Sequence, residues 1–133
     1  MTENWAMIDI ETLGTGDMPV VLSMGIVLYD PWDDYREIAI EDLNTLYLKP
    51  TVESCTDIGC EIDDDTLDWW GKQDVETIEE AFSYEDRESI QVVMKKMYKF
   101  CSSSDFYWAQ GAIFDYNILE HIAKKLHRGV PWK

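Results

Sequence analysis

The chain has 133 residues, of which 46% are hydrophobic, and it contains six Trp, seven Tyr and four Phe. This composition excludes a disordered tail and predicts a single domain spanning residues 1–133. The formal net charge of −16 argues against a protein that binds nucleic acid by charge alone. No apolar run approaches the ~20 residues of a membrane helix and no signal peptide opens the chain, so we expect a cytoplasmic protein without a membrane partner.

Charge is unevenly distributed along the sequence. Residues 53–88 hold 14 carboxylates and two basic side chains, whereas residues 89–133 hold seven Lys and Arg and three acids. We therefore expect any contact with phosphate to come from the last third of the chain.

The three cysteines are an odd number and do not indicate a disulfide framework. A zinc site that combines Cys55 and Cys60 with His121 and His127 is conceivable. Free cysteines are the interpretation we favour.

Residues 5–16 begin as an apolar run typical of a buried strand, which Asp9 and Glu11 interrupt. Because side chains alternate along a strand, Asp9 and Glu11 point to one face, and Ile8 and Ile10 point to the other. Two adjacent carboxylates need cations, protons or hydrogen bonds to compensate their charge, and a divalent metal is the strongest candidate. Taken alone, this pattern leaves a solvated face equally open.

The next two apolar stretches also predict strands. A turn at residues 14–17 leads into the first, over residues 20–29, and a turn at residues 30–34 leads into a more exposed one over residues 38–48, with a bulge. Together with the opening strand they predict a three-stranded antiparallel meander. Residues 50–63 lack a period and predict a loop.

The second half of the chain is mainly helical in pattern. One short helix is expected to begin at Asp65, which can cap it, and another near Gln73. A longer helix is expected from Asp86, followed by a short buried strand over residues 106–109 and a last helix from Ile113 to about His127. The apolar stripe of the longer helix predicts core packing and consists of Ile90, Val93, Met94, Met97 and Cys101.

The last helix carries a carboxylate on its inner side. Its stripe of Asp115, Leu119, Ile122 and Leu126 places Asp115 where the helix packs against the sheet. An acid in a first turn also stabilises the helix dipole, which is a simpler use. Because Asp9 and Glu11 need a compensating partner, we favour Asp115 as a third metal ligand.

Three segments in chain order resemble the DEDD, and more closely the DEDDh-like, 3′–5′ exonucleases of the ribonuclease-H-like superfamily. They are Ile8-Asp-Ile-Glu-Thr-Leu-Gly14, Asp63-Asp-Asp-Thr-Leu-Asp-Trp-Trp-Gly-Lys-Gln73 and Trp108-Ala-Gln-Gly-Ala-Ile-Phe-Asp-Tyr-Asn-Ile-Leu119. The likeness is greatest to phage DexA-type exonucleases and related bacterial exoribonuclease domains. It implies an α/β ribonuclease-H-like fold, in which a mixed sheet with the antiparallel meander and a parallel fourth strand carries packed helices.

The resemblance also implies a site and an activity. In that family the Asp-x-Glu pair and the Asp of the second motif hold two divalent ions, Mg²⁺ or Mn²⁺, which implies Asp9, Glu11 and Asp115 as catalytic ligands. The substrate would be the 3′ end of single-stranded DNA or RNA, from which nucleoside monophosphates are released. The sequence leaves the choice of sugar open. Residues implied in nucleotide binding are Thr12, Leu13, Gly14 and Phe114, with Trp70 and Gln73 as further candidates.

One family motif has no match. A third motif, His-x4-Asp or Tyr-x3-Asp, supplies the general base and a fourth carboxylate, but no acid follows Glu120 here, and His121 and His127 lack the required spacing. We therefore expect an incomplete exonuclease domain, truncated at its C-terminus, with impaired turnover. The missing segment could leave an edge that favours a homo-oligomer, or a partner chain could supply the fourth ligand.

The alternative function is a non-catalytic acidic protein that mimics nucleic acid and binds a basic protein. The charge of −16 motivates this hypothesis. We favour the exonuclease, expected in the host cytoplasm if the protein is phage-encoded, because charge mimicry gives no reason for two carboxylates inside an apolar strand.

Overall fold

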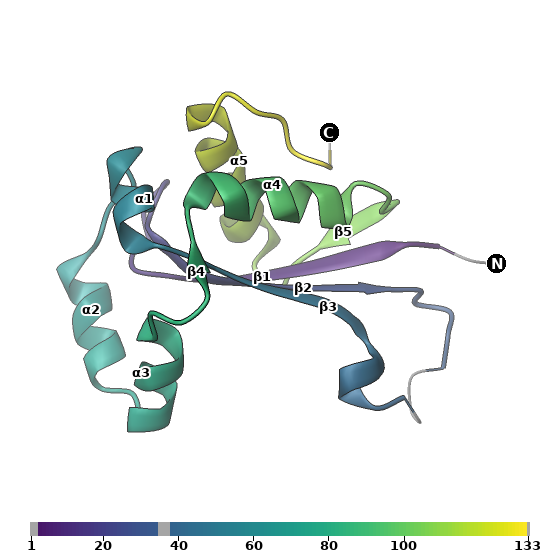
Figure 1. Ribbon diagram of the computed structural model, residues 1–133, viewed down its shortest axis with the longest axis horizontal. Coiled ribbons are helices and arrows are strands. Elements are labelled where there is room, and N and C mark those ends of the chain that lie inside the picture. Colours follow the sequence, from purple (N-terminus) through teal and green to yellow (C-terminus); the bar gives the residue numbers. More distant parts are fainter. Residues whose placement is uncertain (1–2, 35–37, 133) are drawn as a thin grey trace.

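A five-stranded mixed sheet forms the centre of the protein (Figure 1). The computed structural model describes residues 3–34 and 38–132. The strands lie side by side in the order β4-β3-β2-β1-β5. Their bounds are β1 (Trp5–Thr12), β2 (Val21–Tyr29), β3 (Asn44–Pro50), β4 (Arg87–Glu88) and β5 (Phe106–Trp108).

The pairing confirms the predicted meander. Strand β2 pairs antiparallel with both β1 and β3, and β5 runs parallel to β1 with Phe106 opposite Trp5. The parallel strand expected in fourth place is the fifth in the chain, because Arg87 and Glu88 add a short strand parallel to the end of β3. This mixed α/β sheet is the ribonuclease-H-like arrangement that the resemblance implies.

Helices cover the two sides of the sheet unequally. Figure 1 shows α4 and α5 over one side, with α2 and α3 toward the other side at the end where β1 finishes. The bounds are η1 (Ile40–Asp42, a 3₁₀ turn), α1 (Val52–Asp57), α2 (Asp64–Gly71), α3 (Val75–Phe82), α4 (Ile90–Cys101) and α5 (Ala112–Lys125). The side opposite α4 and α5 is therefore covered only in part.

The core lies between the sheet and the pair α4 and α5. The predicted stripe of α4 is buried throughout, and so are Leu119 and Ile122 of α5. Along β1 the alternation holds, because Ile8 and Ile10 are buried whereas Asp9 and Glu11 are exposed. Full burial of one such aliphatic side chain stabilises the fold by about 1.5–3 kcal/mol, so the alternation fixes which face of β1 carries the carboxylates.

The structure corrects the loop expected over residues 50–63. Residues 52–57 form α1, whose Thr51 hydroxyl accepts a hydrogen bond from the Ser54 amide at 3.4 Å, and Cys55 is fully buried. Six residues are too few to show a helical period, which is why the pattern missed this helix.

Three other boundaries differ from the sequence pattern. The third strand begins at Asn44 instead of Ile38, since a 3₁₀ turn precedes it. The long helix begins at Ile90 instead of Asp86, because the Ser89 hydroxyl caps it by accepting from the Val92 amide at 3.3 Å. Helix α2 has Asp63 at its N-cap position, where Asp65 was expected.

Arg87 ties three elements together beneath the open side of the sheet. Its guanidinium donates to the carbonyl oxygens of Leu22 and Pro50, both at 2.9 Å, and of Ala81 and Ser83, both at 2.6 Å. These bonds join β2, β3 and the end of α3. They fix α3 beside the Glu11 end of β1.

All three cysteines are free and buried. None of the helices in the described part of the chain is long and apolar enough to cross a bilayer.

Candidate active site

Asp9 and Glu11 project from the uncovered side of β1. In the register with β2, Asp9 lies opposite Gly25 and Glu11 lies opposite Ser23. A Cβ added to Gly25 would meet only the backbone oxygen of Asp9, at 4.0 Å. The residues facing the two carboxylates are therefore small, and they leave room above this part of the sheet.

Asp115 reaches the same strand from its edge. It lies in the first turn of α5, directly after the parallel strand β5, and its side chain is 5% exposed. The backbone of Ile10 forms a hydrogen bond with its carboxylate. Because Ile10 lies between Asp9 and Glu11, this bond places Asp115 beside the pair, as the inward stripe of the last helix predicted.

The three carboxylates share one electric field. Although the Glu11 side chain is exposed, the surrounding protein partly desolvates its carboxyl, and this desolvation, followed by the charges of Asp9 and Asp115, raises the pKa of Glu11. Burial, followed by the charge of Asp9, raises the pKa of Asp115 from 3.8 to about 6, against the lowering effect of the Ile10 bond. Repulsion between neighbouring carboxylates contributes to the rise of both pKa values, although burial is the larger cause.

Carboxylate oxygens are the donors that Mg²⁺ and Mn²⁺ prefer, and no basic side chain in the described part of the chain contributes to the pKa shifts of Glu11 and Asp115. The donor chemistry therefore fits a divalent ion. Within residues 3–34 and 38–132, however, no three His, Cys, Asp or Glu side chains are gathered as a ready-made metal site. Metal binding by Asp9, Glu11 and Asp115 stays a prediction, and the zinc alternative with Cys55 and Cys60 gains no support.

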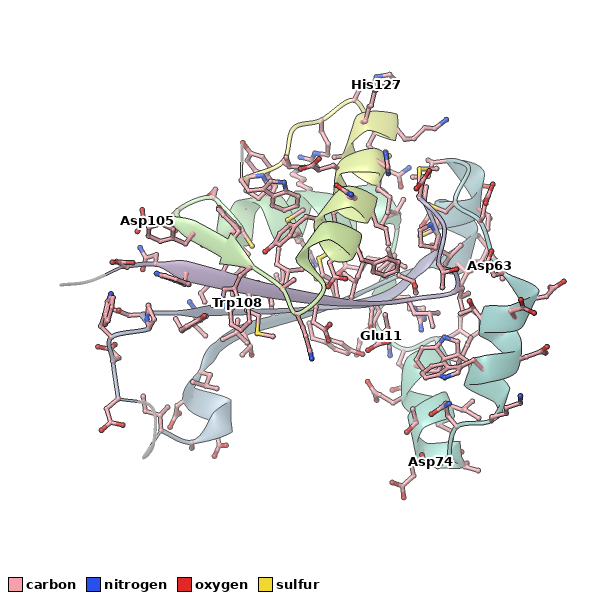
Figure 2. The ribbon with its side chains drawn as sticks, turned by 180° about the vertical axis from the view of Figure 1, so that it is seen from behind. Glu11, Asp63, Asp74, Asp105, Trp108 and His127 are labelled. Atoms are coloured by element: carbon pink, nitrogen blue, oxygen red, sulfur yellow. The ribbon has the colours of Figure 1, made fainter. Side chains whose placement is uncertain are left out.

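A cleft of about 790 Å³ opens beside Glu11. Its walls come from the end of β1, the loop that follows, α2 and the start of α5 (Figure 2). A volume of this size suits a nucleotide-sized ligand. The lining residues are Ile10, Glu11, Thr12, Gly14, Thr15, Ile62, Asp63, Asp64, Asp65, Thr66, Trp69, Trp70 and Phe114.

Asp63 holds the loop after β1 in place. Its amide donates to the Leu13 carbonyl at 2.9 Å, and its carboxylate accepts from the Thr15 amide at 3.0 Å. A Cβ at Gly14 would lie 3.1 Å from the side chain of Pro19 and 3.2 Å from the Asp63 carboxylate, which explains the glycine. This wall of the cleft is therefore fixed before any ligand binds.

Comparison with known proteins gives the family. The family model of the 3′-5′ exoribonuclease Rv2179c-like domain matches residues 4–133, almost the whole chain. The chain belongs to this family. The Rv2179c-like domain is also similar to a crystal structure of zinc-bound E. coli ExoI in complex with single-stranded DNA, with 13% identity and a TM-score of 0.64. That alignment covers 99% of the domain and 25% of the ExoI chain, so the domain spans a quarter of its neighbour. A search of curated proteins finds no match.

Among the residues implied in nucleotide binding by this Rv2179c-like domain, Phe114 is accessible to a ligand in the cleft. It is 39% exposed and lines the cleft. Leu13 is 3% exposed and belongs to the core, so in this conformation it presents no free edge to a base. Leu13 was implied in nucleotide binding, and its apolar packing in the core explains why it is not exposed to a ligand in this conformation. Thr12 and Gly14 line the cleft, and the Thr12 hydroxyl donates to the Gly14 carbonyl at 2.8 Å.

The two candidates from the helix α2 region serve mainly to build the wall. Trp70 is 5% exposed, donates from Nε1 to the Thr12 carbonyl at 3.1 Å, and packs edge-on against Phe82. Gln73 donates to the Trp69 carbonyl at 3.0 Å and does not line the cleft. Both side chains form hydrogen bonds within the protein, and Trp70 also lines the cleft, so direct binding of the nucleotide by Trp70 and Gln73 stays a prediction.

Trp69 is the cleft residue that the sequence pattern missed. It is 53% exposed and lines the cleft beside its buried neighbour Trp70. The Trp-Trp pair held the signal, because adjacent residues on one helix cannot both face the core.

Neither histidine lies with the carboxylates. The His121 Nδ1 atom is 2.9 Å from the Asp17 carbonyl oxygen, which ties α5 to the loop between β1 and β2. His127 follows the end of α5, and Figure 2 shows it at the opposite end of that helix from Glu11.

Proposed function

We propose that this domain is a metal-dependent 3′–5′ exonuclease that releases nucleoside monophosphates from the 3′ end of a single nucleic-acid strand. The observation that carries the proposal is that Asp9, Glu11 and Asp115 interact electrostatically next to an aromatic-lined cleft. The family of the chain supports the reaction. The single-stranded DNA in the ExoI structure supports a single-stranded substrate.

The three carboxylates would hold two divalent ions, Mg²⁺ or Mn²⁺. Such ions supply Lewis-acid chemistry by lowering the pKa of a bound water and stabilising the oxygen that leaves. The raised pKa values of Glu11 and Asp115 support this role, because burial and the neighbouring carboxylates disfavour their charged forms, which a bound cation would favour. The charge of Asp9 acts on both Glu11 and Asp115, and we propose that Asp9 contacts both ions.

The aromatic side chains of the cleft and the rigid loop after β1 would position the terminal nucleotide. Trp69 and Phe114 present exposed rings on which a base can stack, at about 1–3 kcal/mol per stacked base. Asp63 and Trp70 hold the Thr12–Thr15 loop from behind. A wall fixed in advance lowers the entropy cost of orienting the scissile phosphate beside the carboxylates.

The general base is not supplied by either histidine of this chain in our proposal. His121 is engaged with the backbone of Asp17, and His127 lies past the far end of α5. Loss of general-base catalysis costs about 10²–10⁴-fold in rate, so we propose that this chain alone turns over slowly. A second copy or another chain that supplies a base would raise the rate.

The test is release of mononucleotides from 5′-labelled RNA and DNA strands with Mg²⁺ or Mn²⁺. We expect shortening from a free 3′ hydroxyl, slower shortening when a 3′ phosphate blocks the end, and loss of activity with chelator. Asp9→Asn and Asp115→Asn should abolish release. Asp68→Asn is the matched control, since Asp68 is an exposed acid on α2 that does not line the cleft. Full activity of Asp9→Asn, or cleavage at internal positions, would contradict the proposal.

A further inference from the structure

Polar and basic side chains form a single stripe along α5. Phe114, Asn117, His121 and Lys124 are separated by three or four positions in turn, which is the spacing of one helical face, and Arg128 follows beyond Lys125, where α5 ends. The first four are exposed, and Arg128, just past the helix end, is half-buried. The stripe thus begins at the cleft with an aromatic ring and ends with two cations.

Three hollows lie in turn along this stripe, and each shares lining residues with the next. The cleft beside Glu11 shares Thr15 and Phe114 with a second hollow of about 670 Å³, between the loop after β1 and the start of α5. The second hollow shares Asn117 with a third, of about 550 Å³, which His121, Lys124 and Arg128 line. The contact of His121 with the Asp17 carbonyl fixes the two walls of the second hollow to each other.

Charge changes sign along this row of hollows. The cleft is lined by Glu11 and by Asp63, Asp64 and Asp65, whereas the third hollow has Lys124 and Arg128 against Glu120. Phe114 and Lys124 are ten residues apart, or about 15 Å along the helix. In a chain of net charge −16, cations placed at this distance from the carboxylates complement the phosphates of a short strand.

The ordinary explanation for Lys124 is that it stabilises the C-terminal end of α5 through the helix dipole. Lys125 serves the dipole equally well, but it lines none of the three hollows. Replacing each lysine in turn therefore distinguishes a role in stabilising the helix dipole from a role in lining the third hollow.

We infer that the row of hollows along α5 is the path of the substrate strand on the 5′ side of the scissile phosphate, with Lys124 and Arg128 contacting a phosphate a few nucleotides from the 3′ end. This inference rests on the proposed function, because the 3′ end must occupy the carboxylate cleft. It assigns a role to Lys124 and Arg128, two basic side chains of the last third of the chain that the carboxylate site does not use.

The test compares Lys124→Glu with Lys125→Glu, which make the same change of charge at adjacent positions. The probes are a 5′-fluorescein dinucleotide and octanucleotide, each a single strand with a free 3′ hydroxyl, and binding is followed by anisotropy in Ca²⁺ over a range of salt. Lys124→Glu should weaken octanucleotide binding about threefold to tenfold. It should also lower the slope of log Kd against log salt by about 0.7. The effect on the dinucleotide should be smaller, and Lys125→Glu should bind the octanucleotide like the unmodified chain.

Equal weakening by the two variants would show a general charge effect and overturn the inference, and so would no weakening by either. Thermal melting of both variants checks that they lose the same helix-end stabilisation. If the unmodified chain binds neither probe in a metal-dependent way, the proposed function and the path fail together. If it binds both and Lys124→Glu has no length-dependent effect, only the path fails.

Discussion

The replacement Asp115→Asn should make the metal-free protein more stable at neutral pH. Burial and the charge of Asp9 raise the pKa of Asp115 from 3.8 to about 6, so the folded state holds this proton more tightly than the unfolded chain does. The contribution of the group to stability is therefore full below about pH 4 and is lost as the pH rises through about 6. An asparagine keeps an oxygen for the Ile10 hydrogen bond but has no charge to repel Asp9.

The expected gain in stability of Asp115→Asn follows from this pKa shift and from an opposing loss of interaction with the helix dipole of α5. At about 1.36 kcal/mol per pKa unit, the rise to about 6 sets an upper bound of about 3 kcal/mol. Solvent screening at the cleft wall reduces this to about 1–2 kcal/mol. The variant also loses a first-turn acid, worth about 0.3–1 kcal/mol to the helix. The net gain at pH 7.5 is then about 1 kcal/mol, or a few degrees in Tm.

Urea unfolding with chelator, from pH 4 to pH 8, measures this directly. The unmodified chain should lose stability across pH 4–6.5 relative to the variant, with little difference between them near pH 4. Added Mn²⁺ should reverse the order at neutral pH, because the ion stabilises the chain that retains the ligand. The reasoning would be refuted if Asp115→Asn were less stable than the unmodified chain at pH 7.5 in chelator and if the stabilities of the two proteins changed with pH in the same way.

Three further predictions concern the hydrogen bonds of Arg87 and the walls of the cleft. Arg87→Lys should lower the free energy of unfolding, measured with urea, by about 2–4 kcal/mol, because Lys cannot form hydrogen bonds with all four carbonyl oxygens that the guanidinium contacts. A loss below about 1 kcal/mol would argue against a structural role for these four hydrogen bonds. Trp69→Ala should weaken oligonucleotide binding by about 1–3 kcal/mol with little loss of stability, whereas Trp70→Phe should lower the free energy of unfolding by about 1 kcal/mol, because it loses the hydrogen bond to the Thr12 carbonyl. Fluorescence titration measures the binding and melting measures the stability. The same result for both variants would contradict the assignment of Trp69 to the ligand and of Trp70 to the wall. Gly14→Ala should lower the stability of the protein by about 1–3 kcal/mol. Gly16→Ala should lower it less, because a Cβ at Gly16 meets nothing within 4 Å. Equal Tm values for the two variants would count against a tightly packed loop.

Alternation and helical period predicted well the elements that carry the candidate site. On β1 the pattern separated Ile8 and Ile10 from Asp9 and Glu11, because burial on one face fixes the register of the strand. On α5 the same logic placed Asp115 against the sheet, where it is 5% exposed. Both successes rest on elements long enough to show a period.

The cleft walls could not be predicted in the same way, because contacts between distant residues decide them. Asp63 would cap α2 by local chemistry, yet it makes no side-chain capping bond there, and its carboxylate accepts from the Thr15 amide instead. Trp70 turns inward because its indole reaches the Thr12 carbonyl, 58 positions away, which leaves Trp69 to line the cleft. The burial of Leu13 likewise follows from tertiary packing that a motif does not reveal.

The central claim is that Asp9, Glu11 and Asp115 together hold the ions that act on the strand end, and anomalous diffraction from crystals grown with Mn²⁺ and a nucleoside 5′-monophosphate tests it most directly. We predict manganese within about 2.0–2.6 Å of oxygens from all three carboxylates, with the nucleotide phosphate on the same ions and its base beside Trp69 or Phe114. Manganese bound elsewhere, or nucleotide bound away from these carboxylates, would contradict the account.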